Sequence, residues 1–202
     1  VVVGFGPAGI FAAYVLAKYG YQPLVLERGD AIAARDAAVA DFWSGGKLDE
    51  NSNIQFGEGG AGAYSDGKLT TRIGDPLCDE VLRILNTFGA PPEIQRMAKP
   101  HIGTDILKDV VQAMRQEIVR VGGQVRFRCT VEGVSTMHDA LSGLRTTAGE
   151  TACEQAILAI GHSARDTFFA LHENGIFLEP KPFSVGVRIE HLQEDINRAL
   201  YG

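Results

Sequence analysis

The motif GFGPAG near the start of the chain restricts the fold more than any other feature of the sequence. It places Gly4, Gly6 and Gly9 in G-x-G-x-x-G spacing directly after the β-branched run VVV. The following residues, 7–19, are largely apolar and predict a helix, and the segment 23–27 predicts a second strand. A strand, a glycine turn, a helix and a second strand ending in an acid together predict a right-handed βαβ unit with a dinucleotide-binding turn.

Each glycine of this motif has a mechanical role. Gly4 permits a tight turn out of the first strand, Gly6 lets a pyrophosphate approach the backbone, and Gly9 lets the helix pack against the sheet. Pro7 and Ala8 stand at the start of the helix, where free N–H groups and the helix dipole face the phosphates. We therefore expect all five residues to belong to the cofactor site.

Three charged residues extend this predicted site. Glu27 lies 18 residues beyond Gly9, near the distance at which a carboxylate accepts hydrogen bonds from ribose hydroxyls and disfavours a 2′-phosphate. Arg28 follows it, and is expected either to cover the adenine or to lie on the surface. Arg35, on the next predicted helix, is a candidate for contact with the phosphates.

The rest of the chain predicts a parallel sheet with helices and a small meander. Composition and helical spacing predict helices over 31–42, 76–88, 104–121 and 163–173. Thr104 is the expected N-cap of the third helix, and Ser163 with Asp166 has the spacing of a capping box in the fourth. Strands are predicted over 124–128, 131–137, 143–147, 152–156, 156–160 and 183–190. The three segments between 131 and 156 predict the antiparallel meander.

The stretch ENSNIQFGEGGAGAYSDGKLTT, over 50–71, is rich in glycine and has almost no aliphatic residues. A flexible linker would be indifferent in its other residues, whereas this stretch mixes glycine with amide, acidic, hydroxyl and basic side chains. A loop of this length inside a compact domain is typically functional or disordered. Because glycine permits close approach of the backbone, we expect this loop to lie against a ligand.

The glycine motif by itself does not distinguish FAD from NAD. Three later features favour FAD: the second strand leads into a helix and the long glycine loop, the meander interrupts the sheet, and the strand AILAI resumes it and ends at Gly161. In open α/β sheets, ligands bind at the carboxyl ends of the strands. We therefore expect Gly4, Glu27 and Gly161 to converge on one site.

This order of elements resembles the glutathione-reductase-like flavoproteins with two dinucleotide-binding domains. Here the turn AIG stands where ATG is common in that superfamily. The motifs NSNIQFGEGGAGAYSDGKLTT, PHIGTD, LAIGHSARDTF, KPFSVGVRIEH and the final YG are similar to the bacterial family of uncharacterised FAD-dependent dehydrogenases, over nearly the whole chain. The resemblance implies a flavin cofactor and no particular substrate, and complete members carry additional sequence at both ends.

The resemblance also implies further cofactor contacts. The glycine-rich loop should lie along the flavin, with Ser65 and Gly67 at phosphate or ribityl groups. Lys68 should either neutralise a phosphate or stabilise negative charge near N1 of the reduced flavin. The remaining expected contacts come from strand ends: Val131 at the adenine edge, and Ala159, Gly161 and His162 near the flavin.

The expected organisation is an FAD-binding Rossmann-type domain over 1–175, followed by the start of a truncated substrate domain over 176–202. The first domain includes the glycine-rich loop at 50–72, a helical insertion at 75–100 and the meander at about 129–155. The expected function is FAD-dependent oxidoreduction of an unknown small molecule, with NAD(P)H as a candidate electron donor and the catalytic residues unidentified. The alternatives are an NAD(P)-linked dehydrogenase without flavin, a non-catalytic flavin-binding sensory module and, more weakly, a tRNA-modifying flavoprotein.

Composition argues against several other classes. The net charge of −6 and pI of about 5.4 disfavour nucleic acid as a partner. No apolar run approaches the roughly 20 residues that span a bilayer, so no membrane partner is expected. Cys78, Cys129 and Cys153 have neither metal-binding nor redox-pair spacing, which suits reduced thiols in a cytoplasm and predicts no metal site. The oligomeric state is left open.

Overall fold

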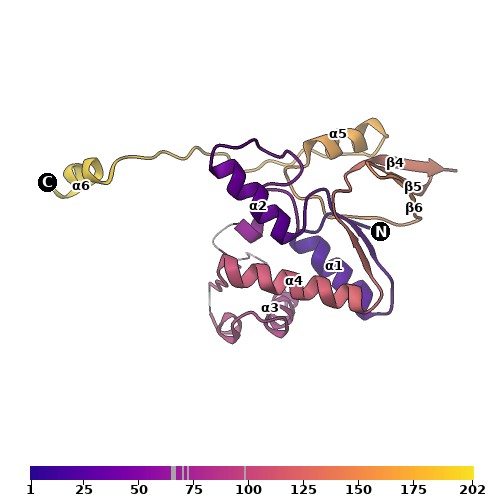
Figure 1. The fold of residues 1–202 in the computed structure, drawn as a ribbon, viewed down its shortest axis with the longest axis horizontal. Coiled ribbons are helices and arrows are strands. Elements are labelled where there is room, and N and C mark those ends of the chain that lie inside the picture. The colour runs from indigo at the N-terminus through magenta and orange to yellow at the C-terminus, as the bar shows by residue number, and fades with distance from the viewer. Residues whose placement is uncertain (65–66, 70, 72, 98) are drawn as a thin grey trace.

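The computed structural model describes residues 1–64, 67–69, 71, 73–97 and 99–202. These residues form one parallel and one antiparallel sheet, with helices around the parallel one (Figure 1). The parallel sheet has the strand order β3-β2-β1-β7. Its strands are β1 (Val2–Val3), β2 (Leu24–Leu26), β3 (Gln124–Arg126) and β7 (Ile157–Leu158). The predicted Rossmann-like α/β class, with a meander inserted before the last parallel strand, is confirmed.

The first βαβ unit forms as its sequence predicts. Helix α1 (Pro7–Lys18) begins after the N-cap Gly6 with proline at its first position, where no hydrogen-bond donor is required. It ends at Lys18, and Gly20 follows the C-cap Tyr19 with a φ of +84°, a left-handed conformation that favours glycine. Strand β2 then returns parallel to β1, with Val2 opposite Val25. The chain therefore delivers the glycine turn to the carboxyl edge of the sheet.

Four of the other helices, α2 to α5, follow the predicted ranges closely, whereas the helix over 193–201 was not predicted. These helices are α2 (Ile32–Trp43), α3 (Leu77–Thr87), α4 (Thr104–Arg120), α5 (Arg165–Glu173) and α6 (Gln193–Tyr201), with 3-10 turns η1 (Ala61–Tyr64) and η2 (Pro92–Gln95). Two predicted caps are wrong. Gly103, with φ +88°, occupies the N-cap position assigned to Thr104, and its carbonyl accepts from the N–H of Leu107 at 3.1 Å. The N-cap of α5 is Ala164, so Ser163 and Asp166 form no capping box.

The meander lies where it was predicted, but its strands have different limits. Its strands are β4 (Val131–Met137), β5 (Ala140–Thr146) and β6 (Gly149–Ala152), in that order. His138 and Asp139 have φ of 52° and 61°, so they make a two-residue hairpin turn instead of the longer predicted turn over 138–142. The shorter turn starts β5 earlier, and β6 consequently pairs over 149–152 instead of 152–156.

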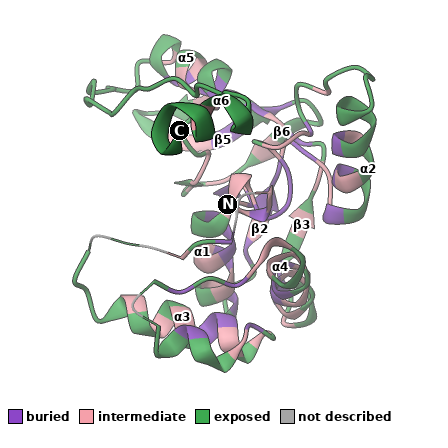
Figure 2. Ribbon diagram, turned by 90° about the vertical axis from the view of Figure 1, so that its left-hand side faces the viewer, coloured by how far each residue is buried: buried purple, intermediate pink, exposed green. Residues whose placement is uncertain are grey.

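Alternating residues of the short parallel strands separate two apolar clusters. Val2 and Val25 belong to the larger cluster, which also holds the buried faces of α1 and α4. Val3 and Leu26 face the opposite way and pack with Val131 and other residues of the meander. Figure 2 shows the buried residues gathered around the parallel sheet and its helices. The sheet is therefore covered on both faces, as parallel sheets generally are.

The segment after α5 departs from the prediction. Residues 176–192 form neither helix nor strand, so the strand predicted over 183–190 is wrong for this structure. Its alternate apolar residues remain solvent exposed, at 83% for Phe183 and 86% for Val187, and the segment extends away from the sheets (Figures 1 and 2). A strand needs a hydrogen-bonding neighbour, and the described residues supply none here. Among the described residues, no helix is both long and apolar enough to cross a membrane.

Two adjacent residues of α4 test how the core stabilises the fold. Ile118 is fully buried in the larger cluster, whereas the neighbouring Val119 is 50% exposed. We expect Ile118→Ala to lower the free energy of unfolding by about 2–5 kcal/mol, because it leaves a cavity. Val119→Ala should change it by about 0.5 kcal/mol or less. Urea unfolding followed by circular dichroism measures both, and equal losses from the two variants would contradict this placement of α4.

Candidate functional site

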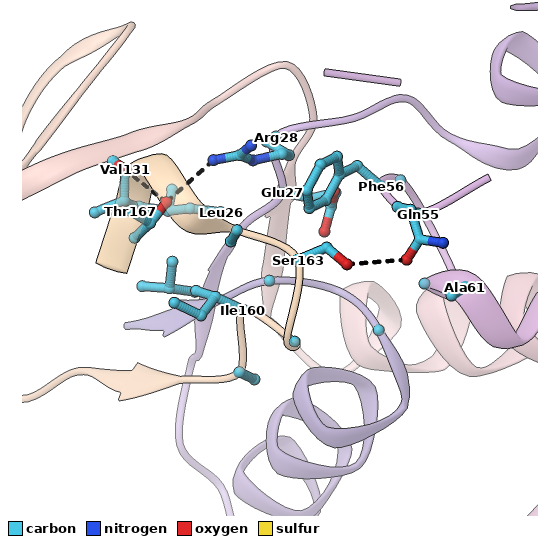
Figure 3. Close-up of a pocket in the computed structure, with 18 of the residues that line it drawn as sticks. Leu26, Glu27, Arg28, Gln55, Phe56, Ala61, Val131, Ile160, Ser163 and Thr167 are labelled. Atoms are coloured by element: carbon cyan, nitrogen blue, oxygen red, sulfur yellow. Dashed lines mark hydrogen bonds between the residues drawn. The ribbon is translucent and has the colours of Figure 1, made fainter. Parts of the chain in front are cut away.

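A pocket opens at the carboxyl ends of β1, β2 and β7 (Figure 3). Its cavity volume is about 110 Å³, and it is partly open to solvent. The glycine-rich loop and the start of α5 provide its other walls. Eight of the predicted cofactor contacts line it: Gly4, Gly6, Glu27, Arg28, Val131, Ala159, Gly161 and His162.

Three further residues of the glycine motif lie beside this pocket. Pro7 and Ala8 border an adjoining pocket that shares Gly6 and Gly161 with the first. Gly9 borders neither, because it packs behind the turn: a Cβ at this position would lie 1.9 Å from the carbonyl oxygen of Gly4. Gly9 therefore packs α1 against the turn and the end of β7, close to the predicted packing on the sheet, and it does not line the pocket in which it was predicted to contact the cofactor.

The Glu27 carboxylate is buried at the floor of the pocket, with only 4% of the residue exposed. Its Oε2 accepts a hydrogen bond from the N–H of Phe5 at 2.6 Å, and its Oε1 accepts one from the N–H of Gly29 at 2.9 Å. The carboxylate therefore joins the turn after β1 to the turn after β2. Because each carboxylate oxygen accepts more than one hydrogen bond, Glu27 retains capacity for a hydroxyl donor in the pocket.

The glycine-rich loop lies directly on the backbone of these two turns. The N–H of Gly59 donates to the carbonyl of Phe5 at 2.9 Å. A Cβ at Gly60 would lie 3.0 Å from the Cα of Gly6, and a Cβ at Gly29 would lie 2.6 Å from the Cα of Gly57. These glycines are thus required because backbone packs against backbone, and the ligand contact predicted from composition is not their only constraint.

Arg35 lies in a different environment from the one predicted. It is fully buried, and its guanidinium donates to four loop carbonyls at 2.6–3.0 Å, those of Asn53, Ile54, Glu58 and Gly60. Burial lowers the pKa of Arg35, although neighbouring groups such as Tyr64 oppose this effect. The guanidinium is therefore directed at the glycine-rich loop, which does not favour the predicted phosphate contact.

Ionic contacts from α2 and α4 hold the same loop in place. The buried Glu58 carboxylate accepts from Arg115 Nε at 2.6 Å and from the N–H of Ile32 at 2.9 Å. The Tyr64 hydroxyl donates to Asp36, which also pairs with Lys108 at 2.6 Å. Burial and the hydrogen bond to Asp36 raise the pKa of Tyr64. Both ends of the segment 58–64 are consequently attached to helices.

The second half of the loop lies apart from the pocket beside Glu27. Gly67 accepts from the N–H of Ile102 at 3.0 Å, and Lys68 forms an isolated antiparallel bridge with His101. Both residues border an apolar space between α1, α3 and α4. The predicted contact Ser65 lies outside the described residues. Cofactor contacts by this part of the loop stay predictions.

Sequence reasoning named Arg28 but missed the side chains that hold it at one end of the pocket. Arg28 Nη2 donates to both carboxylate oxygens of Asp166, at 2.8 and 2.9 Å, and to the hydroxyl of Thr167 at 3.0 Å. Its guanidinium also lies 4.4 Å from the ring centre of Phe56. Across the mouth, the hydroxyl of Ser163 donates to Gln55 at 3.2 Å (Figure 3). The hydrogen-bonded partners in these contacts are more than 100 residues apart in sequence, so a local sequence pattern cannot predict them.

The fold and this pocket can be compared with known proteins. Models of known protein families give no match. An uncharacterised protein of Clostridium beijerinckii is 52% identical over 202 residues, which are 100% of this chain and 38% of that protein. The chain thus spans well under half the length of this relative.

Solved structures support the fold. The crystal structure of THI4 from Thermovibrio ammonificans has a TM-score of 0.50 and 19% identity, over 85% of this chain and 58% of that one. A thioredoxin reductase of Lactococcus lactis has a TM-score of 0.43 and 16% identity, over 80% of this chain and 34% of that one. This similarity is too low to support a conclusion about the fold. The similarity to THI4 establishes the Rossmann-like fold alone.

The packing of loop on turn can be tested at Gly29. A methyl group there would collide with Gly57 and with the carbonyl of Asn51, at 2.6 and 2.8 Å. We expect Gly29→Ala to cost about 1–3 kcal/mol of unfolding free energy and to expose the segment 50–60 to proteases. Gly74→Ala is the matched control, since a Cβ at Gly74 meets no atom within 4 Å. Equal stability and equal cleavage of the two variants would show that the loop does not pack on this turn.

Proposed function

We propose that this chain is the cofactor-binding part of an FAD-dependent oxidoreductase that acts on a small molecule. One observation carries the proposal: the buried Glu27 and Gly6, the N-cap of α1, line the same pocket, at the carboxyl edge of a parallel sheet. This is the location at which open α/β sheets bind nucleotides.

The residues of the pocket fit the ADP half of a dinucleotide. Glu27 would accept hydrogen bonds from the ribose hydroxyls. The start of α1 would face the pyrophosphate, because its first turn contains no acidic residue and Gly6 has no side chain to obstruct approach. Val131, buried at the start of β4, would border the adenine. Gly60 and Ala61 would cover the phosphates from the opposite side.

The topology favours FAD over NAD as the resident cofactor. After β2 the chain enters α2 and the glycine-rich loop, and three antiparallel strands precede β7. This arrangement, with the family resemblance of the motifs, supports a flavoprotein. When bound, FAD supplies the electron and hydride transfer, so no nucleophile of the chain is needed. The chain's own task would be to bind and orient the cofactor, and Ala159, Gly161 and His162, which line the same pocket, would lie past the pyrophosphate.

The remaining parts of the proposal concern the protein beyond this pocket. Residues 1–175 would be the FAD-binding domain, and 176–202 would begin a substrate domain completed by other segments of a longer protein. The exposed apolar residues of 183–189 support that assignment, since they have no partner among the described residues. NADH or NADPH would serve as the electron donor, in a cytoplasmic setting.

An absorption spectrum of the purified full-length protein tests this function. We expect the two visible bands of oxidised flavin, and bleaching of these bands in an anaerobic titration with NADH or NADPH. Flavin bands that neither nucleotide bleaches would point to another donor or to a sensory module. Absence of flavin after reconstitution with FAD would overturn the proposal and favour an NAD(P)-linked dehydrogenase.

Gly6→Ala separates cofactor binding from folding. Gly6 has an ordinary φ of −79°, and the nearest atom to an added Cβ is 3.6 Å away, so the fold should accept the methyl group. The same methyl group would stand between the backbone and the pyrophosphate. We expect FAD affinity to fall at least about tenfold with little change in unfolding free energy. Gly9→Ala is the contrasting variant, because its Cβ would collide with Gly4 and should disrupt the fold itself. Unchanged FAD affinity in Gly6→Ala, measured by flavin fluorescence titration, would contradict the assigned phosphate position.

A further inference from the structure

Arg28 is the basic residue closest in sequence to Glu27, and it borders the same pocket. Its side chain is 11% exposed, and it is held from two sides. Phe56 of the glycine-rich loop lies against its guanidinium at 4.4 Å, and Asp166 and Thr167 of α5 bind its Nη2 atom. Figure 3 shows Arg28 beside Glu27, reaching toward Thr167. The cation is thus an ordered part of the pocket wall.

The contacts with α5 use one of the three guanidinium nitrogens. All three hydrogen bonds to Asp166 and Thr167 come from Nη2. Within the part of the chain that the structure describes, Nε and Nη1 of Arg28 donate to no protein acceptor. Arginine has five N–H donors, so this residue retains the geometry to bind a second anion. The pair of Arg28 and Asp166 has no net charge, because the Asp166 carboxylate neutralises the guanidinium.

An arginine beside the ribose-binding acid is the usual means of recognising a ribose 2′-phosphate. Here the three neighbouring charges of Glu27, Arg28 and Asp166 sum to −1 + 1 − 1 = −1. Without Asp166 they would sum to zero, and the guanidinium would be free to pair with a phosphate. Asp166 itself lies at the outer side of the pair, with 60% of its side chain exposed. Burial acts to raise the pKa of Asp166, but the hydrogen bonds from Arg28 and from backbone N–H groups hold it below its ordinary value.

We infer that Asp166 determines the nucleotide specificity of the pocket: by occupying Arg28, it makes the site select an adenosine with a free 2′-hydroxyl and reject one with a 2′-phosphate. The inference rests on the proposed function, since it requires a dinucleotide in this pocket. It gives the ion pair between the turn after β2 and α5 a role beyond attaching the helix. It also accounts for how the site can hold an arginine next to Glu27 and still admit FAD in preference to a 2′-phosphorylated nucleotide such as NADP(H).

The test compares ADP-ribose with 2′-phospho-ADP-ribose, which differ only in the 2′-phosphate. Affinities are measured by isothermal titration calorimetry on the full-length protein after removal of bound cofactor. The wild-type protein should bind ADP-ribose more tightly. Asp166→Asn should shift the ratio of the two affinities toward the 2′-phosphate by about tenfold, because a charge-assisted pair with Arg28 becomes available. Glu27 is present in both proteins, so the change in ratio isolates Asp166.

Two controls separate charge from helix attachment. Thr167→Val removes a hydrogen bond from Arg28 but leaves the carboxylate, so the affinity ratio should stay as in the wild type. Adding Arg28→Gln to Asp166→Asn should abolish the gain. Asp166→Ser is the second variant for the case that the asparagine variant misfolds, as judged by circular dichroism.

The possible results distinguish failure of the inference from failure of the proposed function. An unchanged ratio in a folded Asp166 variant overturns the inference. So does an equal shift in Thr167→Val, or a shift that persists when Arg28 is replaced. If the wild-type protein binds neither probe nor FAD, the proposed function fails instead.

Discussion

Backbone packed directly against backbone is the constraint on which this pocket depends. The turn after β1, the turn after β2 and the glycine-rich loop meet where Gly29, Gly57 and Gly60 have no side chains. A Cβ at Gly29 or Gly60 would lie 2.6 or 3.0 Å from the Cα of the facing glycine. Only glycine permits this approach. The pocket wall is therefore determined by the chain itself, and a nucleotide would enter a groove already formed.

Two buried charged side chains hold this arrangement, one by accepting hydrogen bonds and the other by donating them. Glu27 accepts from the N–H groups of Phe5 and Gly29, and so joins the two turns. Arg35 donates to four carbonyls of the glycine-rich loop, and so gathers the loop around α2. Burying either charge unpaired would be costly, and each is compensated by several hydrogen bonds. Glu27 lines the pocket whereas Arg35 does not, so of these two charges only Glu27 is placed to meet a ligand there.

The local sequence pattern was sufficient to predict the parts of the fold whose structure depends on residues close in sequence. The first βαβ unit, the range of α4 and the existence of the meander follow from periodicity and from glycine positions. The errors lie where two neighbouring residues compete for one structural position, or where the structure of a segment depends on a partner distant in sequence. Gly103 replaced Thr104 as a cap because a left-handed residue ends the preceding loop, and 183–190 formed no strand because no neighbour pairs with it.

The site was predictable to the same extent. The spacing of the glycine motif and Glu27 predicted that Gly4, Gly6 and Glu27 meet at one edge of the sheet, and all three line the pocket there, while their cofactor contacts stay predictions. Arg35 was predicted to contact the phosphates, but its guanidinium donates to loop carbonyls, and a sequence pattern does not identify such partners. The Arg28–Asp166 pair joins residues 138 positions apart, and only the folded chain brings them together.

The central claim is that the pocket beside Glu27 holds the ADP half of FAD. A crystal structure of the full-length protein grown with FAD tests it most directly. The account predicts adenosine with its ribose hydroxyls on Glu27 and its pyrophosphate between Gly6 and Gly60. A nucleotide bound elsewhere, or a Glu27 carboxylate that contacts only Phe5 and Gly29 in the presence of bound FAD, would contradict it.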